Sequence, residues 1–243
     1  MKFKNEVWAV IPARSGSKGL KDKNIKIFKN KPLLAHSIIS AKKNRFIKKI
    51  IFSSDSKRYI SIAKKYGCDI YHKRSKKNSS STSKDIDLFK EILIFLKLKK
   101  ISYPKYFAHL RPTTPIRKNS TINNAIKIFS KKKNLYSSLK SISINSHNSH
   151  KDFIIKNKKL CSILKKYQYN IDKVNVPRKS MAPTYIGNGV IDIYRTKNII
   201  HGKLLGSKVL PYLIKDLFSD IDNAYDLKLA TLIHSRKMLQ LKY

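Results

Sequence analysis

Acidic residues are scarce in this sequence, and three of them fall within residues 220–226. These are Asp220, Asp222 and Asp226, in a chain that has only 14 aspartates and glutamates in total. In an extended segment, residues two apart point to the same face, so Asp220 and Asp222 could share one cation. Two carboxylates that act together with substrate phosphates are typical of a magnesium site. The alternative is a helix start capped by Asp222 or Asn223 and stabilised by Asp226, and both interpretations can hold together.

A loop rich in glycine, serine and cationic residues runs from Arg14 to Asn24. Glycine and serine let backbone N–H groups approach an anion closely, and Arg14, Lys18 and Lys23 add fixed positive charge. The loop has neither the Walker A pattern nor the Gly-x-Gly-x-x-Gly pattern of dinucleotide-binding proteins. A purely structural turn is the alternative, but the position directly after the first expected strand favours a phosphate-binding loop.

Two further segments place polar groups where strands are expected to end or begin. Residues 110–117 read Leu-Arg-Pro-Thr-Thr-Pro-Ile-Arg, so two prolines hold two hydroxyls and two guanidinium groups on a short stretch. A rigid turn before a helix explains this segment about equally well. Residues 187–189 read Gly-Asn-Gly, which in isolation suggests a hairpin turn.

Alternating apolar runs must position these segments. The runs have the lengths and spacings of strands and helices in turn, four times within the first half of the chain, and this predicts an α/β protein with a parallel sheet and helices on both faces. The expected strands are 7–11, 47–53, 68–71 and 106–110, and the expected helices are 33–41, 60–66, 86–98 and 122–129.

The regular pattern stops between Leu139 and Tyr185, where the sequence is polar and contains no long helical repeat. We therefore expect residues 140–185 to form an insertion with short strand-like pieces. The remaining expectations are a catalytic domain of residues 1–139 and 186–243, a strand piece at 153–155, strands at 190–194 and near 209–213, and a last helix at 224–239.

The net charge of +40 comes from 54 lysines and arginines, of which 45 are lysine and only 9 are arginine. Nucleic-acid surfaces use arginine heavily because its planar fork binds phosphates and guanine bidentately, whereas here the lysines are scattered in pairs along the chain. The sequence therefore favours a compositional bias over nucleic-acid binding. The charge still attracts anionic small molecules such as nucleotides.

Other features of the sequence exclude several classes of protein. Hydrophobic residues make up 41% of the chain, which is ordinary for a folded protein. No run approaches the ~18 apolar residues of a membrane span, and the first residues do not resemble a signal peptide. Cys68 and Cys161 lie far apart, which argues against a zinc site and for a reducing compartment. We expect a soluble, cytoplasmic protein.

Taken together, these segments resemble the acylneuraminate cytidylyltransferases, also called CMP-sialic acid synthetases, over almost the whole chain. Residues 11–24 resemble the family's signature loop, and residues 110–117 its Leu-Gln-Pro-Thr-Ser-Pro-Leu-Arg. Asn188-Gly189 resembles its Asn-Gly before a strand, and residues 220–222 its metal-binding Asp-x-Asp. The resemblance implies a three-layer, Rossmann-like nucleotidyltransferase fold with a mainly parallel sheet and a small dimerisation insertion.

The resemblance also implies a reaction in which CTP and an acidic nonulosonate sugar give a CMP-sugar and pyrophosphate, for surface polysaccharide or glycan synthesis. By this resemblance the protein is a homodimer in which each insertion reaches into the partner's active site. The implied catalytic residues are Arg14, Lys18, Lys23, Asp220 and Asp222, the last two holding Mg²⁺. The implied substrate-binding residues are Ser15, Gly16, Asn24, Arg74, Arg111, Lys151, Arg178, Asn188, Gly189 and Asp192. Among these, Asn24 and Arg74 would meet the cytidine, and Lys151 and Arg178 the acidic sugar.

The sequence departs from the family pattern at positions that face the sugar. Arg111 replaces a glutamine, Ile186 an arginine and Asp192 an aromatic residue, while on the cytidine side Asp85 replaces a serine or threonine. These changes alter the charge around the sugar, and we therefore expect a related sugar acid, such as a legionaminate-like one. The alternatives are a nucleotidyltransferase for another acid such as Kdo, a basic nucleic-acid-binding protein, and a homologue that folds without catalysing.

Overall fold

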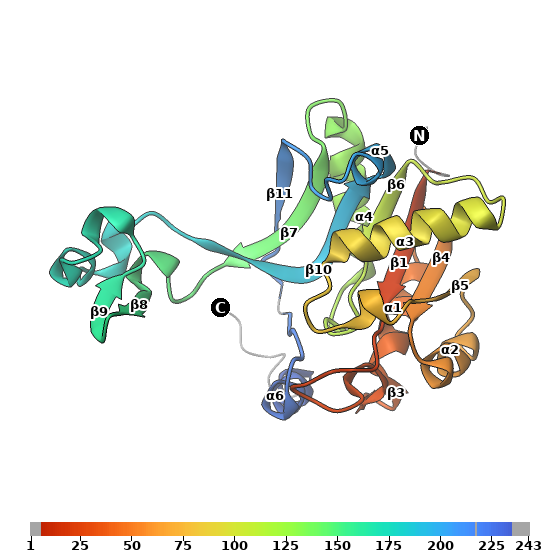
Figure 1. The fold of residues 1–243 in the computed structure, drawn as a ribbon, viewed down its shortest axis with the longest axis horizontal. Helices are drawn as coiled ribbons and strands as arrows, with labels where there is room; N and C mark the ends of the chain where they lie inside the picture. The colour runs from red at the N-terminus through yellow and green to blue at the C-terminus, as the bar shows by residue number, and fades with distance from the viewer. Residues whose placement is uncertain (1–5, 217, 235–243) are drawn as a thin grey trace. The chain divides into compact units, whose positions relative to one another are not determined.

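The computed structural model describes residues 6–216 and 218–234. Its main sheet has seven strands in the order β11-β7-β10-β6-β1-β4-β5 (Figure 1). Strand β1 is parallel to β4 and β6, β4 is parallel to β5, and β10 is antiparallel to β6. The strands are β1 (Val7–Pro12), β4 (Ile47–Ser54), β5 (Ile70–Lys73), β6 (Tyr106–His109), β7 (Ser138–Ile144), β10 (Tyr185–Arg195) and β11 (Val209–Leu213). The mainly parallel α/β sheet predicted from the sequence is therefore confirmed.

Helices cover both faces of this sheet, as successive residues of β6 show. Because neighbouring strand residues point to opposite faces, Phe107 packs on Phe89 of α3 with ring centroids 5.6 Å apart, and Tyr106 packs on Phe129 of α4 at 5.4 Å. The three-layer arrangement follows (Figure 1). The helices are α1 (Leu33–Lys42), α2 (Lys57–Lys64), α3 (Asp85–Leu98), α4 (Asn119–Lys132), α5 (Thr196–Ile200) and α6 (Ala224–His234).

Helix α3 contributes most to one half of the core, because its apolar residues recur at helical spacing and face the sheet. They pack against Trp8 and Val10 of β1 and Phe107 of β6. Burial of such side chains contributes about 1.5–3 kcal/mol each. The buried apolar residues of α3 are Leu88, Phe89, Ile92, Leu93 and Leu96.

The observed elements differ from the expected ones most clearly at β7, at β5 and at the Gly-Asn-Gly segment. Strand β7 was not predicted, because Ser138–Ile144 carries few apolar residues although it belongs to the main sheet. Strand β5 starts at Ile70 rather than Cys68. The Gly-Asn-Gly segment is not a hairpin turn but part of β10, where Gly189 has a φ of +66°. The last helix is described to His234, and the rest of its expected range lies outside the described residues.

The chain forms two compact units. The first comprises Met1–Ser141, Asn188–Tyr212 and Asp216–Tyr243, and the second comprises Ile142–Gly187 with Leu213–Lys215; the insertion expected from the sequence was 140–185. In the second unit, β8 (Phe153–Lys156) and β9 (Lys159–Ser162) form an antiparallel hairpin. The short elements of the chain are β2 (Ile27–Phe28), β3 (Lys31–Pro32), η1 (Lys23–Ile25), η2 (Lys77–Ser79), η3 (Ser149–Lys151), η4 (Lys165–Tyr167), η5 (Ile171–Val174) and η6 (Arg178–Ser180). Among the described residues, no helix has both the length and the apolar character needed to cross a membrane.

Candidate active site

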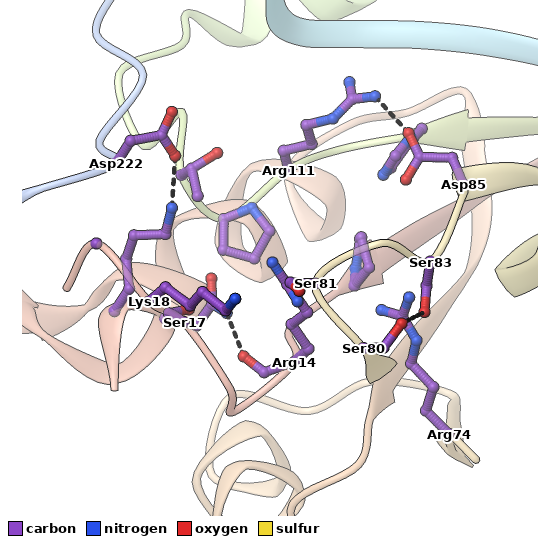
Figure 2. A pocket seen from close by; sticks show the side chains of 17 residues that line it. Arg14, Ser17, Lys18, Arg74, Ser80, Ser81, Ser83, Asp85, Arg111 and Asp222 are labelled. Atoms are coloured by element: carbon purple, nitrogen blue, oxygen red, sulfur yellow. Dashed lines mark hydrogen bonds and ion pairs between the residues drawn. The ribbon is translucent and has the colours of Figure 1, made fainter. Parts of the chain in front are cut away.

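A cavity of about 460 Å³ opens at the carboxyl ends of β1 and β6, in the first unit (Figure 2). Parallel sheets bind their ligands at this edge, because the loops that follow the strands converge there. Five of the lining residues are cationic and two are acidic. The charged lining residues are Arg14, Lys18, Lys23, Arg74, Arg111, Asp85 and Asp222, and the other polar ones are Ser17, Asn24, Ser80, Ser81, Ser83, His109 and Thr113.

The glycine- and serine-rich loop after β1 is fixed to the end of β4. Its first residue donates a backbone hydrogen bond from Ala13 N to Ser53 O at 2.8 Å. The two carboxylate oxygens of Asp55 then accept from the backbone N–H and the hydroxyl of Ser15, each at 2.8 Å. Because both oxygens of one carboxylate are used, the start of the loop is held in a single orientation.

The far end of the same loop is also held by side chains. Asn24 is 5% exposed and donates from Nδ2 to the backbone oxygen of Arg14 at 2.9 Å, which joins the two ends of the loop. Tyr59 of α2 donates its hydroxyl to Asp22 Oδ1 at 2.9 Å, and Asp22 itself has the left-handed φ of +56°. Arg14 and Lys18 are thereby presented at the cavity on a constrained backbone, which reduces the entropy lost on binding a ligand.

The aspartate segment before α6 lies against this loop. Lys23 Nζ and Asp222 Oδ1 form an ion pair at 2.5 Å, and a Cβ atom at Gly19 would stand only 2.7 Å from the backbone oxygen of Asp222. The backbone N–H of buried Ile221 donates to Thr113 O at 2.8 Å, which ties the segment to the loop after β6. A glycine is required at position 19 by this close approach.

Both interpretations of the aspartate segment find support in its geometry. Asn223 Oδ1 accepts from Asp226 N at 2.9 Å, and Asp226 Oδ2 accepts from Asp222 N at 2.8 Å, so these side chains cap the start of α6. The expected N-cap is confirmed. The Asp222 carboxylate stays 68% exposed at the cavity. Desolvation and the neighbouring charge of Asp222 raise the pKa of the Asp220 carboxyl, while a hydrogen bond from Thr113 opposes them.

Arg111, at the opposite side of the cavity, is bound between two carboxylates. It donates from Nη2 to Asp85 Oδ2 at 2.8 Å (Figure 2). It also donates from Nη1 to Asp192 Oδ2 at 2.8 Å. Asp192 is 1% exposed and also accepts from the Tyr194 hydroxyl at 3.0 Å. Burial alone would raise the pKa of Asp192, but Arg111 and then Lys140 hold it below its usual range. The charge changes noted in the sequence at positions 85, 111 and 192 therefore compensate one another inside the protein.

His109 is buried beside this network and is neutral. Burial and the nearby guanidinium of Arg111 lower the pKa of the ring to about 3. Its Nδ1 lies 3.4 Å from the Tyr194 hydroxyl, which already donates its hydrogen to Asp192. The Tyr194 oxygen can therefore only accept, so Nδ1 carries the proton and Nε2 is an acceptor. This Nε2 has no hydrogen-bond partner among the described residues.

Two buried guanidinium nitrogens at the cavity also lack a partner within the described part of the chain. They are Nη1 of Arg14 and Nε of Arg74. Arg74 is 7% exposed, and its burial lowers the pKa of its guanidinium. Buried donors without a partner cost free energy, which a bound acceptor such as a phosphate or a nucleoside oxygen would recover.

The structure brings about half of the predicted site residues to this one cavity. Those that line it are Arg14, Lys18, Lys23, Asn24, Arg74, Arg111 and Asp222. Ser15, Gly16, Asp220, Asn188, Gly189 and Asp192 lie in the same unit but outside the lining. Lys151 and Arg178 belong to the second unit, where Lys151 Nζ donates to the backbone oxygen of Val176 at 2.8 Å.

Several residues at the cavity were not singled out from the sequence. His109 interrupts an otherwise apolar strand, and that is the one signal that could have revealed it. Ser17 and Ser80 carry ordinary loop hydroxyls with no distinguishing pattern, whereas Thr113 belongs to the 110–117 segment noted in the sequence. Asp55 follows directly after the β4 strand, a position where polar residues are often functional, but its partner Ser15 lies far away in the sequence.

This arrangement can bind a polyphosphate together with a divalent cation. Arg14, Lys18 and Lys23 supply positive charge on a fixed loop, and the exposed carboxylate of Asp222 stands next to Lys23. A triphosphate placed there would meet cations on its oxygens and a carboxylate suited to Mg²⁺. The neutral imidazole and the loop hydroxyls on the other walls can hydrogen-bond uncharged groups of the same ligand.

Comparisons with known proteins agree with this chemistry. A family model described as cytidylyltransferase matches residues 8–177. The chain is 32% identical to an N-acylneuraminate cytidylyltransferase of Escherichia coli over 98% of its own length and 54% of that protein. It is 35% identical to a CMP-N,N'-diacetyllegionaminic acid synthase of Legionella pneumophila over 50% of the chain and 52% of that protein. The chain thus spans about half the length of these curated relatives.

Solved structures add evidence for the fold. A CMP:2-keto-3-deoxy-manno-octonic acid synthetase complexed with CTP superposes with a TM-score of 0.67, covering 96% of this chain and 99% of that one. The sequence identity of this pair is 13%, so the likeness supports the nucleotidyltransferase fold and nothing finer.

Proposed function

The chain belongs to the acylneuraminate cytidylyltransferase family, and we propose that it transfers CMP from CTP to an acidic nonulosonate sugar, with release of pyrophosphate. The observation that carries this proposal is the cavity in which Arg14, Lys18 and Lys23 face Asp222 at the carboxyl end of β1. A fixed cationic loop next to an exposed carboxylate suits a nucleoside triphosphate with its metal ion better than it suits any neutral ligand.

In the proposed reaction, the anomeric hydroxyl of the sugar attacks the α-phosphorus of CTP. A new P–O bond forms, the bond between the α- and β-phosphates breaks, and the hydroxyl proton is lost as pyrophosphate leaves. Arg14 and Lys18 would hold the triphosphate and offset the negative charge that grows on the leaving group. Lys23 would exchange part of its contact with Asp222 for a phosphate oxygen.

Asp220 and Asp222 fit a Mg²⁺ ion. Asp220 and Asp222 flank Ile221, whose backbone N–H is tied to the loop after β6, and the Asp222 carboxylate is exposed at the cavity. A divalent cation between the two carboxylates would offset their charge. Two carboxylates plus phosphate oxygens are a typical donor set for this ion. When bound, Mg²⁺ would draw charge from the phosphate oxygens and orient them for attack.

The second unit has surface features that suit the homodimer expected for this family. Its hairpin carries exposed apolar side chains, including Ile155 at 78% and Leu160 at 53%, and Tyr169 nearby is 79% exposed. Apolar side chains in such number favour contact with another protein surface. We further propose that Lys151 and Arg178 of this unit bind the acidic sugar, that the enzyme works in the cytoplasm, and that its product serves surface glycan synthesis.

The sugar is proposed to be a nonulosonate other than ordinary N-acetylneuraminate. The relatives named for legionaminic acid support this class. Of the altered residues, Arg111 lines the cavity, where the family pattern has a glutamine. To test it, purified protein would be incubated with CTP, Mg²⁺ and a panel of N-acetylneuraminate, legionaminate-type, pseudaminate-type and Kdo acids, and pyrophosphate release measured. Reaction with N-acetylneuraminate alone would refute the sugar assignment, and reaction with Kdo alone would favour the alternative.

The metal assignment has its own test. Asp222→Ala is expected to abolish Mg²⁺-dependent pyrophosphate release while the protein stays folded by circular dichroism. Unchanged activity in this variant would remove Asp222 from the metal site. Tight, steeply salt-dependent binding of DNA or RNA without pyrophosphate release would instead support a nucleic-acid-binding protein.

A further inference from the structure

A loop of residues 75–83 separates two cavities. On one side, Ser80, Ser81 and Ser83 line the cavity described above. On the other side, the loop and α3 enclose a second cavity of about 500 Å³, to which Ser80 and Ser83 also contribute. None of residues 75–83 is buried. Because open space lies on both sides, side-chain packing cannot fix this loop, and its position depends on hydrogen bonds.

A single carboxylate supplies most of these hydrogen bonds. Glu91 of α3 accepts from the backbone N–H of Ser75 at 2.7 Å and from the Ser75 hydroxyl at 3.1 Å, and it accepts a third, short hydrogen bond from Asn78 Nδ2. In the described part of the chain, the hydrogen bonds that join residues 75–83 to other segments all run to α3. Besides the three hydrogen bonds to Glu91, these include one long hydrogen bond of 3.5 Å from Asn78 Nδ2 to the backbone oxygen of Asp87.

Glu91 is in turn oriented from the sheet. His72 of β5 is 2% exposed, and its Nε2 lies 3.5 Å from Glu91 Oε1, while its Nδ1 lies 2.9 Å from the hydroxyl of Ser53. Burial lowers the pKa of His72, so the ring is neutral. Its single proton on Nε2 faces the carboxylate, and Nδ1 accepts from Ser53. The chain of contacts therefore runs from the end of β4 through His72 and Glu91 to the loop.

We propose that Glu91 is a positioning residue for the nucleotide, holding the 75–83 loop where its serines form one wall of the binding cavity. Glu91 does not line that cavity. The inference rests on the proposed function, because CTP is the ligand expected there. A carboxylate is required because it accepts from three donors, whereas a glutamine would turn an N–H₂ group toward Ser75 or Asn78.

The test compares Glu91→Ala and Glu91→Gln with Asp87→Asn as the matched control. Asp87 is a carboxylate one turn earlier on α3 that lines the same second cavity but makes none of the three carboxylate hydrogen bonds to the loop. CTP binding is measured by calorimetry, and amide hydrogen exchange reports the 75–83 peptide. Glu91→Ala is expected to weaken CTP binding about tenfold or more and to speed exchange of that peptide, with a smaller effect for Glu91→Gln and less than about twofold for the control.

Loop-side variants keep the inference testable if substitution of Glu91 prevents folding. Ser75→Ala and Asn78→Ala remove two of the three donors, the Ser75 hydroxyl and the Asn78 amide, and keep the backbone N–H of Ser75. Together they are expected to change CTP affinity and loop exchange in the same direction as Glu91→Ala, by a smaller amount. Steady-state kinetics should show a raised KM for CTP with kcat and the KM for the sugar each within about threefold of wild type, a split that general destabilisation does not produce.

Two results would overturn the inference. One is faster exchange of the loop with unchanged CTP affinity, because the loop position would then not matter for the nucleotide. The other is unchanged exchange in Glu91→Ala. If the wild-type chain bound no CTP at all, the proposed function would fail instead, and the exchange data would still show whether Glu91 holds the loop.

Discussion

The hydrogen bonds from Asp55 to Ser15 allow a quantitative prediction for the phosphate-binding loop. Asp55 accepts two hydrogen bonds from Ser15, each at 2.8 Å. Hydrogen bonds to a charged group contribute about 1.5–3 kcal/mol. If Asp55→Ala releases the loop, and if CTP must then order it again at a cost equal to one of these two hydrogen bonds, binding should weaken by about 10- to 150-fold.

Milder substitutions separate the contributions of the two hydrogen bonds and of the Asp55 charge to CTP binding. Ser15→Ala removes only the hydroxyl hydrogen bond and keeps the backbone one, so a loss of about three- to tenfold is expected. Asp55→Asn keeps an acceptor for the backbone N–H but loses the negative charge, and should fall between Ser15→Ala and Asp55→Ala. The assay is calorimetric titration of CTP with Mg²⁺, followed by the KM for CTP in pyrophosphate release.

A matched aspartate controls for loss of stability. Asp69 also accepts from a backbone N–H, that of Ile50 in β4 at 2.7 Å, but it lies away from the cavity lining. Asp69→Ala should lower the melting temperature without changing CTP affinity beyond about twofold. The reasoning is refuted if folded Asp55→Ala binds CTP within about threefold of wild type, or if Asp69→Ala weakens CTP binding equally.

Two other predictions concern the glycines of the loop and the buried carboxylate under Arg111. Gly19→Ala places a Cβ atom 2.7 Å from Asp222 O, so it should lower the free energy of unfolding by about 1–3 kcal/mol. The same variant should have a lower kcat that responds less to added Mg²⁺. Gly16→Ala has no atom within 4 Å of the new Cβ, so its stability and its kcat should stay as in wild type. Asp192 has a lowered folded pKa, so its stabilisation is complete above the unfolded value of about 3.9 and is lost as the pH falls through the folded pKa. In urea unfolding, Asp192→Asn should therefore have a lower free energy of unfolding than wild type at pH 7, and this difference should shrink below about pH 4. A difference in the free energy of unfolding that does not depend on pH would contradict an ionised pair of Asp192 and Arg111.

Much of the sheet could be predicted from the sequence because its strands and helices are encoded locally. The run at residues 7–11 is continuously apolar, as expected for a strand buried on both faces, and the helix at 85–98 repeats its apolar residues at helical spacing. Strand β7 was not predicted because its buried positions are occupied by serines, whereas apolar residues at such positions are what indicates a strand. The buried serines are Ser138, Ser141 and Ser143. Their hydroxyls form hydrogen bonds with backbone oxygens and N–H groups of segments that lie far away in the sequence. Such hydrogen bonds cannot be predicted from the local sequence.

The residues of the candidate site could likewise be predicted from the sequence only in part. Residues in the loop 14–24 were found because glycine, serine and cations are concentrated there. Arg111 was also found, but its pairing with two carboxylates was not predicted, because these come from distant segments, α3 and β10. Glu91 gave no signal at all, since an acidic residue on an amphipathic helix normally faces solvent. Only the folded chain shows that this carboxylate faces a loop.

The end of β4 explains how the two walls of the cavity keep a fixed spacing. Ser53 and Ser54 accept backbone hydrogen bonds from Ala13 and Arg74 at 2.8 and 2.9 Å, so the first residues of both wall-forming loops pair with neighbouring residues of one strand. Asp55 and, through His72, Ser53 then orient the loops by side-chain contacts. The scarce carboxylates are thus used to hold cation-bearing loops rather than to neutralise the cavity. Five cations remain there against two acidic groups, and the missing negative charge is what a triphosphate would bring.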